Sequence, residues 1–393
     1  MDVAARWSKV MMPNYGAPSL ILAEGKGVRV NDADGKTYLD FLAGLAVSST
    51  GHAHPKVASA IAKQASRLLH TSNLYATEEN LRLAERLVDA TGYGKVFFCN
   101  SGGEANDFAL KLARRRAAVK RGSGYRVLTC QNSFHGRSLS TVTLTGQPKY
   151  QKDFGPLLPE IQHVPYNDVA ELEEVFAKGP VAALFIELVQ GEGGVVPATQ
   201  AYAEAAERLC REHDALLVAD EVQTGVGRTG KFLASEIYGI RPDIVTLAKG
   251  LGSGVPIGVV LATDEVARVI APGDHGCTFG GNPLSSAAAL ATLDVIDGED
   301  LVENAAEMGA LLQRRLREAL GSAAREVRGH GLLVGVQFAS PIAKAVKVTC
   351  EREGLLVGAI GDHVIRLAPP LVAKRGDVEE AVAILARAAK ASA

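Results

Sequence analysis

The chain has 393 residues, of which 47% are hydrophobic and 22% charged, with 41 glycines and 16 prolines. This length and composition exclude a disordered protein and a disulfide-bonded miniprotein, and they suit two domains or one large domain with a lobe. The 42 basic and 44 acidic residues give a formal charge of −2, so nucleic acid is not expected as a partner.

The sequence also favours a soluble cytoplasmic protein with no membrane partner. Residues 1–7 lack the apolar core of a signal peptide, and the longest apolar run, 181–186, is far shorter than the roughly 18 residues of a membrane span. The five cysteines are odd in number and widely spaced, which indicates reduced thiols. No zinc-binding spacing of cysteine and histidine is present, so no metal site is expected.

The first 50 residues predict a β-hairpin. Two alternating runs, 27–31 and 36–40, flank Asp34-Gly35, a dipeptide typical of tight turns between strands. We expect this arm to join the C-terminal part of the chain.

The middle of the chain predicts an α/β domain. Near-continuous apolar runs, typical of strands covered on both faces, occur at 95–100, 125–130, 181–187, 215–220 and 243–248. Helical patterns at 104–116 and 202–213 alternate with these strands, which predicts a mostly parallel sheet. In such a sheet the ligands bind at the carboxyl ends of the strands.

From about residue 283 the pattern changes to that of a smaller α+β lobe. An alanine-rich helix and a second helix at 301–320 are followed by short strands at 331–338 and 364–367. We therefore expect a large domain formed by residues 51–285 and a small domain formed by residues 1–50 and 286–393.

A candidate phosphate site follows the strand at 95–100. Ser101 and Glu104 have the spacing of a capping box that opens a helix, and Gly102 and Gly103 let the backbone approach a ligand. Taken alone, the segment is explained equally well by an ordinary capped helix.

A candidate reactive amine follows the strand at 243–248. Lys249 enters a glycine-rich loop at the expected sheet edge, where burial would lower its pKa toward that of a nucleophile. A solvated lysine at the end of a strand is the simpler alternative. Asp220, however, ends another buried strand, and an acid there could hold a pyridinium nitrogen protonated. Phosphate site, lysine and acid together predict a pyridoxal phosphate site.

Two further patterns are not taken as ligand sites. Residues 225–230 match G-x-G-x-x-G, but they neither follow their strand directly nor open a clear helix, which argues against a dinucleotide site. His52 and His54 have no third ligand at a motif spacing, so a loop before Pro55 is the better interpretation.

Several longer motifs occur in order along the chain: Ser101-Gly-Gly-Glu-Ala-Asn106, Phe134-His-Gly-Arg137, Gln190-Gly-Glu-Gly-Gly194, Asp220-Glu-Val-Gln223, Ala248-Lys-Gly250, Thr278-Phe-Gly-Gly-Asn-Pro283 and Ile365-Arg-Leu-Ala-Pro-Pro370. Together they closely resemble the class III pyridoxal phosphate-dependent aminotransferases, over essentially the whole chain. The resemblance implies the fold-type I architecture, with pyridoxal 5′-phosphate as the cofactor and a homodimer with shared active sites.

The resemblance also implies roles in cofactor binding. Lys249 is similar to the lysine that carries the cofactor and moves the substrate's proton, and Asp220 to the partner of the pyridine nitrogen. The other expected cofactor-binding residues are Ser101, Gly102 and Gly103 at the phosphate, Phe134 and Val222 on the two ring faces, Gln223 at the phenolic oxygen, and Thr278 from the second subunit.

Two arginines are implied in substrate binding. Arg137 resembles the residue that binds the carboxylate at the far end of the substrate, and Arg366 the residue that binds the α-carboxylate of glutamate or 2-oxoglutarate. Glu192 is expected to pair with Arg366 when no α-carboxylate is present, and Tyr15 is expected to border the substrate. Without the surrounding motifs, surface salt bridges would explain the two arginines and Glu192 equally well.

The expected reaction moves the terminal amine of N-acetylornithine to 2-oxoglutarate, giving N-acetylglutamate semialdehyde and glutamate in arginine biosynthesis. A related transfer from succinylornithine, ornithine, succinyldiaminopimelate or 4-aminobutyrate remains an alternative, as does a cofactor-binding protein without catalysis. The sequence departs from the family pattern at Gly103, usually alanine, at Leu188, usually proline, and around Ser253, where the family loop is richer in glycine. These departures concern backbone support rather than reacting groups.

Overall fold

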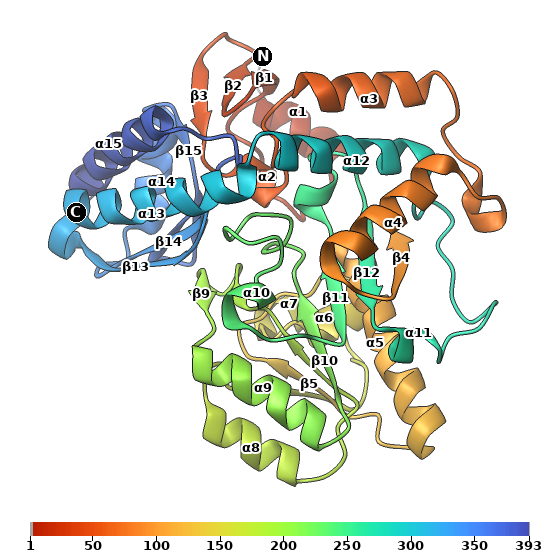
Figure 1. Ribbon diagram of the computed structural model, residues 1–393. Coiled ribbons are helices and arrows are strands. Elements are labelled where there is room, and N and C mark those ends of the chain that lie inside the picture. The colour runs from red at the N-terminus through yellow and green to blue at the C-terminus, as the bar shows by residue number, and fades with distance from the viewer. Residues whose placement is uncertain (1–2, 393) are drawn as a thin grey trace.

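A computed structural model describes residues 3–392, and a seven-stranded sheet lies at its centre (Figure 1). In spatial order the strands are β4 (Lys95–Cys99), β12 (Gly258–Ala262), β11 (Ile244–Leu247), β10 (Leu216–Asp220), β7 (Ala183–Ile186), β5 (Val127–Cys130) and β6 (Ile161–Val164). Only β12 runs antiparallel to its neighbours in this sheet. The predicted α/β fold with a mostly parallel sheet is confirmed.

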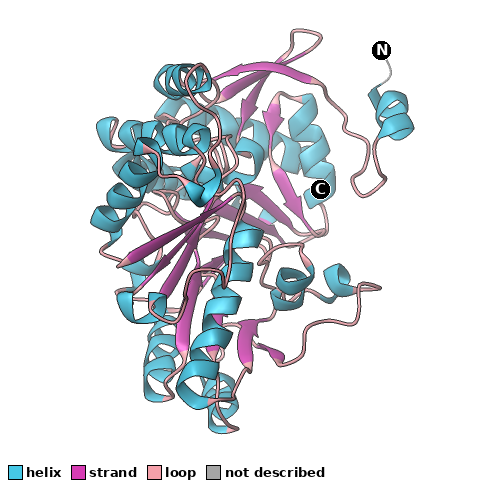
Figure 2. Cartoon of the chain, turned by 90° about the vertical axis from the view of Figure 1, so that its right-hand side faces the viewer, coloured by secondary structure: helices cyan, strands magenta, loops and turns pink. Residues whose placement is uncertain are grey.

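Helices cover both faces of the sheet, and Figure 2 shows them around its twisted strands. On β7, Leu184 and Ile186 pack with α8 (Val169–Ala177) and α9 (Gln200–Glu212), while Ala183 and Phe185 pack with α5 (Gly102–Arg121). Side chains alternate between the faces of a strand, so an unbroken apolar run supplies both packed layers.

Three more helices, α3 (Pro55–Ala65), α4 (Glu78–Thr91) and α12 (Pro283–Gly298), pack over the end of the sheet formed by β4, β12 and β11. Figure 1 shows α12 running alongside α3. The shorter elements of this part of the chain are α2 (Ala43–Ala46), η1 (Ser72–Leu74), α6 (Leu139–Leu144), α7 (Pro148–Gln151), β8 (Val189–Gln190), β9 (Val196–Pro197), α10 (Ser235–Tyr238), η2 (Lys249–Leu251) and α11 (Asp264–Ala267).

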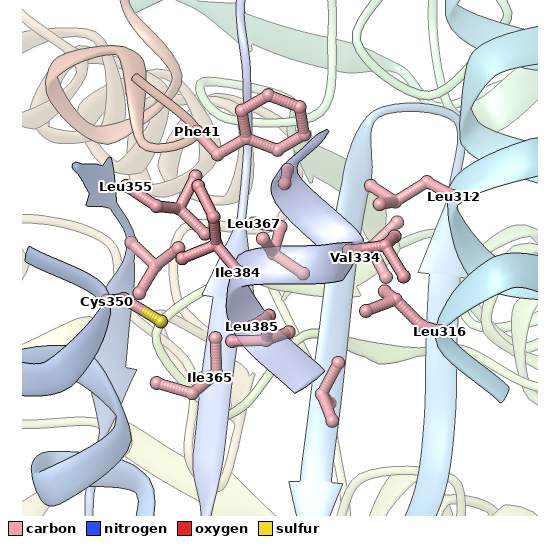
Figure 3. Packing of buried hydrophobic residues seen from close by; sticks show 14 of the residues in the cluster. Phe41, Leu312, Leu316, Val334, Cys350, Leu355, Ile365, Leu367, Ile384 and Leu385 are labelled. Carbon is pink, nitrogen blue, oxygen red and sulfur yellow. The ribbon is translucent and has the colours of Figure 1, made fainter. Parts of the chain in front are cut away.

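A second, antiparallel sheet forms the C-terminal lobe. Its strands in order are β13 (Ala324–His330), β14 (Leu333–Phe338), β17 (Val364–Leu367) and β16 (Gly358–Ile360). The lobe also contains α13 (Leu301–Leu320), η3 (Gly321–Ala323), α14 (Ala343–Arg352) and α15 (Arg375–Ser392). Figure 3 shows how Leu312, Val334, Ile365 and Leu385 bring helices and strands into one apolar core.

The N-terminal arm packs against this lobe. After α1 (Val3–Val10), the strands β1 (Leu22–Lys26), β2 (Arg29–Asp32) and β3 (Thr37–Asp40) form an antiparallel sheet, and β15 (Leu355–Leu356) pairs with β3 in parallel. Phe41 from the arm enters the core drawn in Figure 3. The predicted hairpin at Asp34-Gly35 is confirmed as the turn between β2 and β3.

The predicted domain boundaries, near residues 50 and 285, stay a prediction. The packing of α12 against α3 and α4 favours placing the second boundary after α12. Within residues 3–392, no helix has both the length and the apolar character needed to cross a membrane.

Candidate active site

A cavity of about 360 Å³ lies where the carboxyl ends of β4, β10 and β11 meet. Its walls bring together residues more than a hundred positions apart in the sequence. Among them are eight of the residues predicted to bind the cofactor: Ser101, Gly102, Gly103, Phe134, Asp220, Val222, Gln223 and Lys249. The cavity is at the sheet edge that the strand directions predict for a ligand.

The N-terminus of α5 forms one wall of this cavity. Ser101 caps the helix by accepting a hydrogen bond from the Glu104 N–H at 3.2 Å, and the Glu104 carboxylate accepts one from the Asn100 N–H at 2.6 Å. A Cβ at Gly102 would stand 2.6 Å from the Val222 side chain, so only glycine allows this close approach. At Gly103 a Cβ would make ordinary contacts, so the alanine usual in the family would fit there too. A twenty-residue helix begins at this wall, and because the first N–H groups of a helix have no carbonyl partner within it, this end suits a phosphate.

Lys249 follows β11 and lines the same cavity. Its backbone φ of 43° lies in the left-handed region, which is unusual for a residue other than glycine and is typical of strained functional positions. Burial lowers the pKa of the Lys249 ammonium, although the carboxylate of Asp220 acts in the opposite direction. The neutral amine needed for nucleophilic attack is therefore more accessible than on an ordinary lysine.

Asp220 is fixed at the end of β10 by three hydrogen bonds. Its carboxylate accepts from Asn106 Nδ2 at 2.6 Å and from the Val222 N–H at 3.0 Å, and His135 Nδ1 lies at 2.8 Å. Burial disfavours the charged form of His135, but its hydrogen bond to Asp220 and the charge of that carboxylate outweigh burial and raise its pKa. These three hydrogen bonds hold the Asp220 carboxylate in the cavity wall, where it can face a pyridinium nitrogen.

Glu187, at the end of β7, ties together two loops of the cavity wall. Its carboxylate accepts from the Phe134 N–H at 2.8 Å and from the Gly191 N–H at 3.3 Å. Burial raises the pKa of Glu187 to about 7, while the charge of His135 acts to lower it. Glu187, His135 and Asn106 were not predicted to belong to the site, although His135 and Asn106 lie inside two of the motifs.

Arg366 and Glu192 form an ion pair beside the cavity. Arg366 Nη1 lies 2.5 Å from Glu192 Oε1 and 3.3 Å from Gln223 Oε1. The Arg366 side chain is 4% exposed and that of Glu192 is 24% exposed, so the pair is largely shielded from water. The structure therefore places the two residues together as the sequence predicted.

Tyr15 and Arg137 line a neighbouring cavity of about 470 Å³. Phe134 connects the two cavities, because it lines the first and its ring lies 5.4 Å from the Arg137 guanidinium. Thr278 stands apart from both, exposed in the turn before α12. A single chain thus gathers every predicted site residue except Thr278 around two adjoining cavities.

The patterns set aside in the sequence have structural explanations. Residues 225–230 form consecutive turns without a helix, and a Cβ at Gly230 would stand 2.9 Å from Ala306 of α13, so this glycine allows close packing. His52 and His54 contact two separate carboxylates, those of Asp40 and Glu299.

Comparison with known proteins agrees with the fold. Residues 10–389 match the family model "Aminotransferase class-III". The acetylornithine aminotransferase of Mycolicibacterium smegmatis is 47% identical over 98% of this chain and 97% of its own length.

Two solved structures show the same architecture. One is an ornithine aminotransferase from Toxoplasma gondii, described with partial occupancy of PLP at its active site, with a TM-score of 0.94 and 36% identity over 99% of this chain and 94% of that one. The other is an acetylornithine aminotransferase from Elizabethkingia anophelis, with a TM-score of 0.88 and 34% identity over 98% of each chain.

The fold and the lysine, carboxylate and helix N-terminus around one cavity define a fold-type I pyridoxal phosphate-dependent transferase. The chain belongs to the class III aminotransferase family and is a pyridoxal phosphate-dependent aminotransferase.

Proposed function

We propose that this enzyme transfers the terminal amine of N-acetylornithine to 2-oxoglutarate, giving N-acetylglutamate semialdehyde and glutamate, a step of arginine biosynthesis. The observation that carries this proposal is the shielded pair of Arg366 and Glu192 next to a free Arg137. Relatives named acetylornithine aminotransferase, 44–47% identical over more than nine tenths of the chain, support the same substrate.

The residues of the first cavity would hold the cofactor at both ends. Ser101, Gly102 and Gly103 would bind its phosphate at the start of α5, and Asp220 its pyridine nitrogen. The remaining ring contacts are assigned to Phe134 and Val222 on the faces and to Gln223 at the phenolic oxygen. When bound, pyridoxal phosphate supplies an electron sink that stabilises negative charge on the substrate carbon.

Lys249 would hold the cofactor at its aldehyde carbon through the ε-amine. The ε-amine of Lys249, when free, would also be the base that accepts the proton of the substrate carbon and the acid that later donates it. The lowered pKa of Lys249 serves this task, because a neutral amine can accept a proton. Asp220, held in place by Asn106, Val222 and His135, would face the pyridine nitrogen.

The two arginines would bind the carboxylates of the substrates in the two half-reactions. Arg137, beside Tyr15, would bind the carboxylate at the far end of either substrate. Arg366 would bind the α-carboxylate of glutamate or 2-oxoglutarate, and Glu192 would replace that carboxylate when the substrate presents a terminal amine.

A panel of amine donors tests the substrate. We expect the highest kcat/KM among terminal amines with N-acetylornithine, compared with succinylornithine, ornithine, succinyldiaminopimelate and 4-aminobutyrate. A higher kcat/KM with any of the other four would assign the enzyme to that reaction instead. Absence of any turnover with a full complement of cofactor would favour a protein without catalysis.

We also propose a homodimer in which Thr278 reaches the phosphate of the other subunit. Thr278 is exposed next to Phe279, and exposed Leu74 and Tyr75 suit burial against a second copy. In such a dimer each site takes Lys249 from one subunit and Thr278 from the other. A mixed dimer of a Lys249→Ala subunit and a Thr278→Asp subunit should therefore contain one intact site. No recovery of activity in mixed dimers would place Thr278 outside the partner's site.

A cytoplasmic location stays a prediction, and all five cysteines are free thiols, as it requires.

A further inference from the structure

The side chain of Arg137 differs from that of Arg366 in having no anionic partner. Across residues 3–392, the structure shows neither an ion pair nor a hydrogen bond for the Arg137 guanidinium, whereas Arg366 is bonded to Glu192 and Gln223. An unpaired arginine beside a substrate cavity would sample many rotamers, and ordering it would weaken binding.

An aromatic side chain takes the place of a counterion. The Arg137 guanidinium carbon lies 3.8 Å from the centre of the Tyr150 ring and 5.4 Å from that of Phe134. Both distances are within the roughly 6 Å over which a cation is attracted to a ring face. The rings of Phe134 and Tyr150 meet edge to face at 5.7 Å and 85°, so they support each other.

Contact with a ring face leaves the arginine's hydrogen-bond donors available. The five N–H donors of a guanidinium lie in its plane and point away from its edges. A carboxylate partner would occupy two of these donors and neutralise the charge, as Glu192 does in part for Arg366. A ring face holds the guanidinium without occupying its donors or neutralising its charge.

Tyr150 is itself fixed to the loop that carries Arg137. It lies on α7, where the neighbouring Gln147 donates to the Asn132 and Ser133 carbonyls at 3.2 and 3.1 Å. Gln151 donates to the Thr145 carbonyl at 2.9 Å. The ring therefore moves with the segment of residues 132–145 and can hold Arg137 in one place.

We propose that Tyr150 is a positioning residue that fixes Arg137 with its donors unoccupied, ready for the far carboxylate shared by both substrates. The inference rests on the proposed function, because it assumes that Arg137 binds this carboxylate. The Lys149 ammonium also lies near the Tyr150 ring, at 4.7 Å, but Lys149 is exposed and solvated. It adds positive charge near the cavity without fixing Arg137.

The test compares an amino acid that has a far carboxylate with one that lacks it. Glutamate and alanine share the α-carboxylate for Arg366, but only glutamate can reach Arg137 with a second carboxylate. We would measure single-turnover kcat/KM for both in the holoenzyme and in Tyr150→Leu, Tyr150→Phe and Arg137→Ala. Tyr125→Leu is the matched control, since Tyr125 is an exposed tyrosine outside both cavities.

We expect the glutamate-to-alanine ratio to fall about three- to thirtyfold in Tyr150→Leu, mainly through KM, and to remain within about twofold of wild type in Tyr150→Phe. Arg137→Ala should lower the ratio further, and Tyr125→Leu should leave it unchanged. The affinity for glutarate, an unreactive dicarboxylate, should fall in parallel by calorimetry. Tyr150→Met, which also lacks a ring, provides the same comparison should Tyr150→Leu not fold.

The outcomes separate this inference from the proposed function. A lower ratio in Arg137→Ala with an unchanged ratio in Tyr150→Leu would refute the role of Tyr150 and leave that of Arg137 intact. Equal losses in Tyr150→Phe and Tyr150→Leu would refute the ring-face contact, because phenylalanine keeps it. An unchanged ratio in Arg137→Ala would refute the assigned role of Arg137, and the inference with it.

Discussion

Replacing Glu192 with alanine separates the two half-reactions. In the wild type, Arg366 is only 3% exposed and is paired with Glu192 at 2.5 Å. N-acetylornithine brings no carboxylate to Arg366, so Glu192→Ala would leave a buried guanidinium with only Gln223, at 3.3 Å, as a partner. Glutamate brings its own carboxylate and would no longer need to displace Glu192. The variant should therefore favour glutamate over N-acetylornithine.

The size of this change follows from the burial of the pair. Removing one partner of a fully buried pair costs about 3–5 kcal/mol, whereas an exposed pair contributes at most about 1 kcal/mol. Glu192 is 24% exposed, so water can partly solvate Arg366 after the substitution. We therefore expect the loss of the Glu192 carboxylate to cost about 1–3 kcal/mol. This corresponds to roughly a 5- to 150-fold change in the ratio of kcat/KM for glutamate to kcat/KM for N-acetylornithine.

The assay follows the absorbance of the cofactor in single turnovers with each amine donor. Glu318→Ala is a suitable control, because Glu318 forms an exposed ion pair with Arg315 on α13 and lines neither cavity. An unchanged ratio in Glu192→Ala would show that the pair with Arg366 is only a structural contact. A fall in the ratio of kcat/KM for glutamate to kcat/KM for N-acetylornithine would contradict the roles assigned to Glu192 and Arg366.

Three further substitutions test other parts of the site. Lys249→Ala should retain cofactor through the phosphate contacts and Asp220 but lose transamination, and borohydride reduction with peptide mapping of the wild type should label Lys249. Asp220→Asn should lower kcat at least about a hundredfold, because a neutral amide cannot keep the pyridine nitrogen protonated. The pKa of Glu187 rises from 4.5 to about 7 in the folded chain, so its contribution to stability is full below pH 4.5 and is lost as pH rises through 7. Glu187→Gln should therefore flatten the decline in unfolding free energy between about pH 4.5 and 7, by up to about 3 kcal/mol.

Each of these experiments has an outcome that would contradict the assignment. Label on a lysine other than Lys249 would move the reactive amine elsewhere. Near-native turnover in Asp220→Asn would mean that another group meets the ring nitrogen. An unchanged pH profile of stability in Glu187→Gln would show that Glu187 does not hold a proton in this range.

The five strands predicted for the central sheet are present, because buried parallel strands carry apolar residues on both faces. The two other strands of this sheet, β12 and β6, were not predicted from the sequence. β12 begins at Gly258, and its short apolar sequence has no alternation of polar and apolar residues. Such a sequence does not distinguish a strand from a turn of buried helix. β6 is an edge strand in which Gln162 and His163 interrupt the apolar run.

The residues of the site were predictable to the extent that they lie in motifs directly after strands. Lys249 and Asp220 stood out because a charged group immediately follows an apolar run at a sheet edge. The side chains that hold the site residues in place were not predictable from the sequence. Contacts such as that of His135 with Asp220, or of Tyr150 with Arg137, depend on how loops approach one another in space. Glu187 directly follows β7, and Asp220 is the last residue of β10. This similar position at a strand end was the available indication that Glu187 has a role.

With the roles proposed for them, the two arginines would let one site bind substrates of different charge patterns. A group that binds the same carboxylate in both half-reactions has no reason to carry an internal counterion, since a counterion would compete with every substrate. Arg137 is accordingly held by ring faces. A group that binds a carboxylate in only one half-reaction would be left as a buried, unpaired charge in the other, and Arg366 is accordingly paired with Glu192. The different surroundings of Arg137 and Arg366 thus match how often each would meet a substrate carboxylate in the proposed reaction.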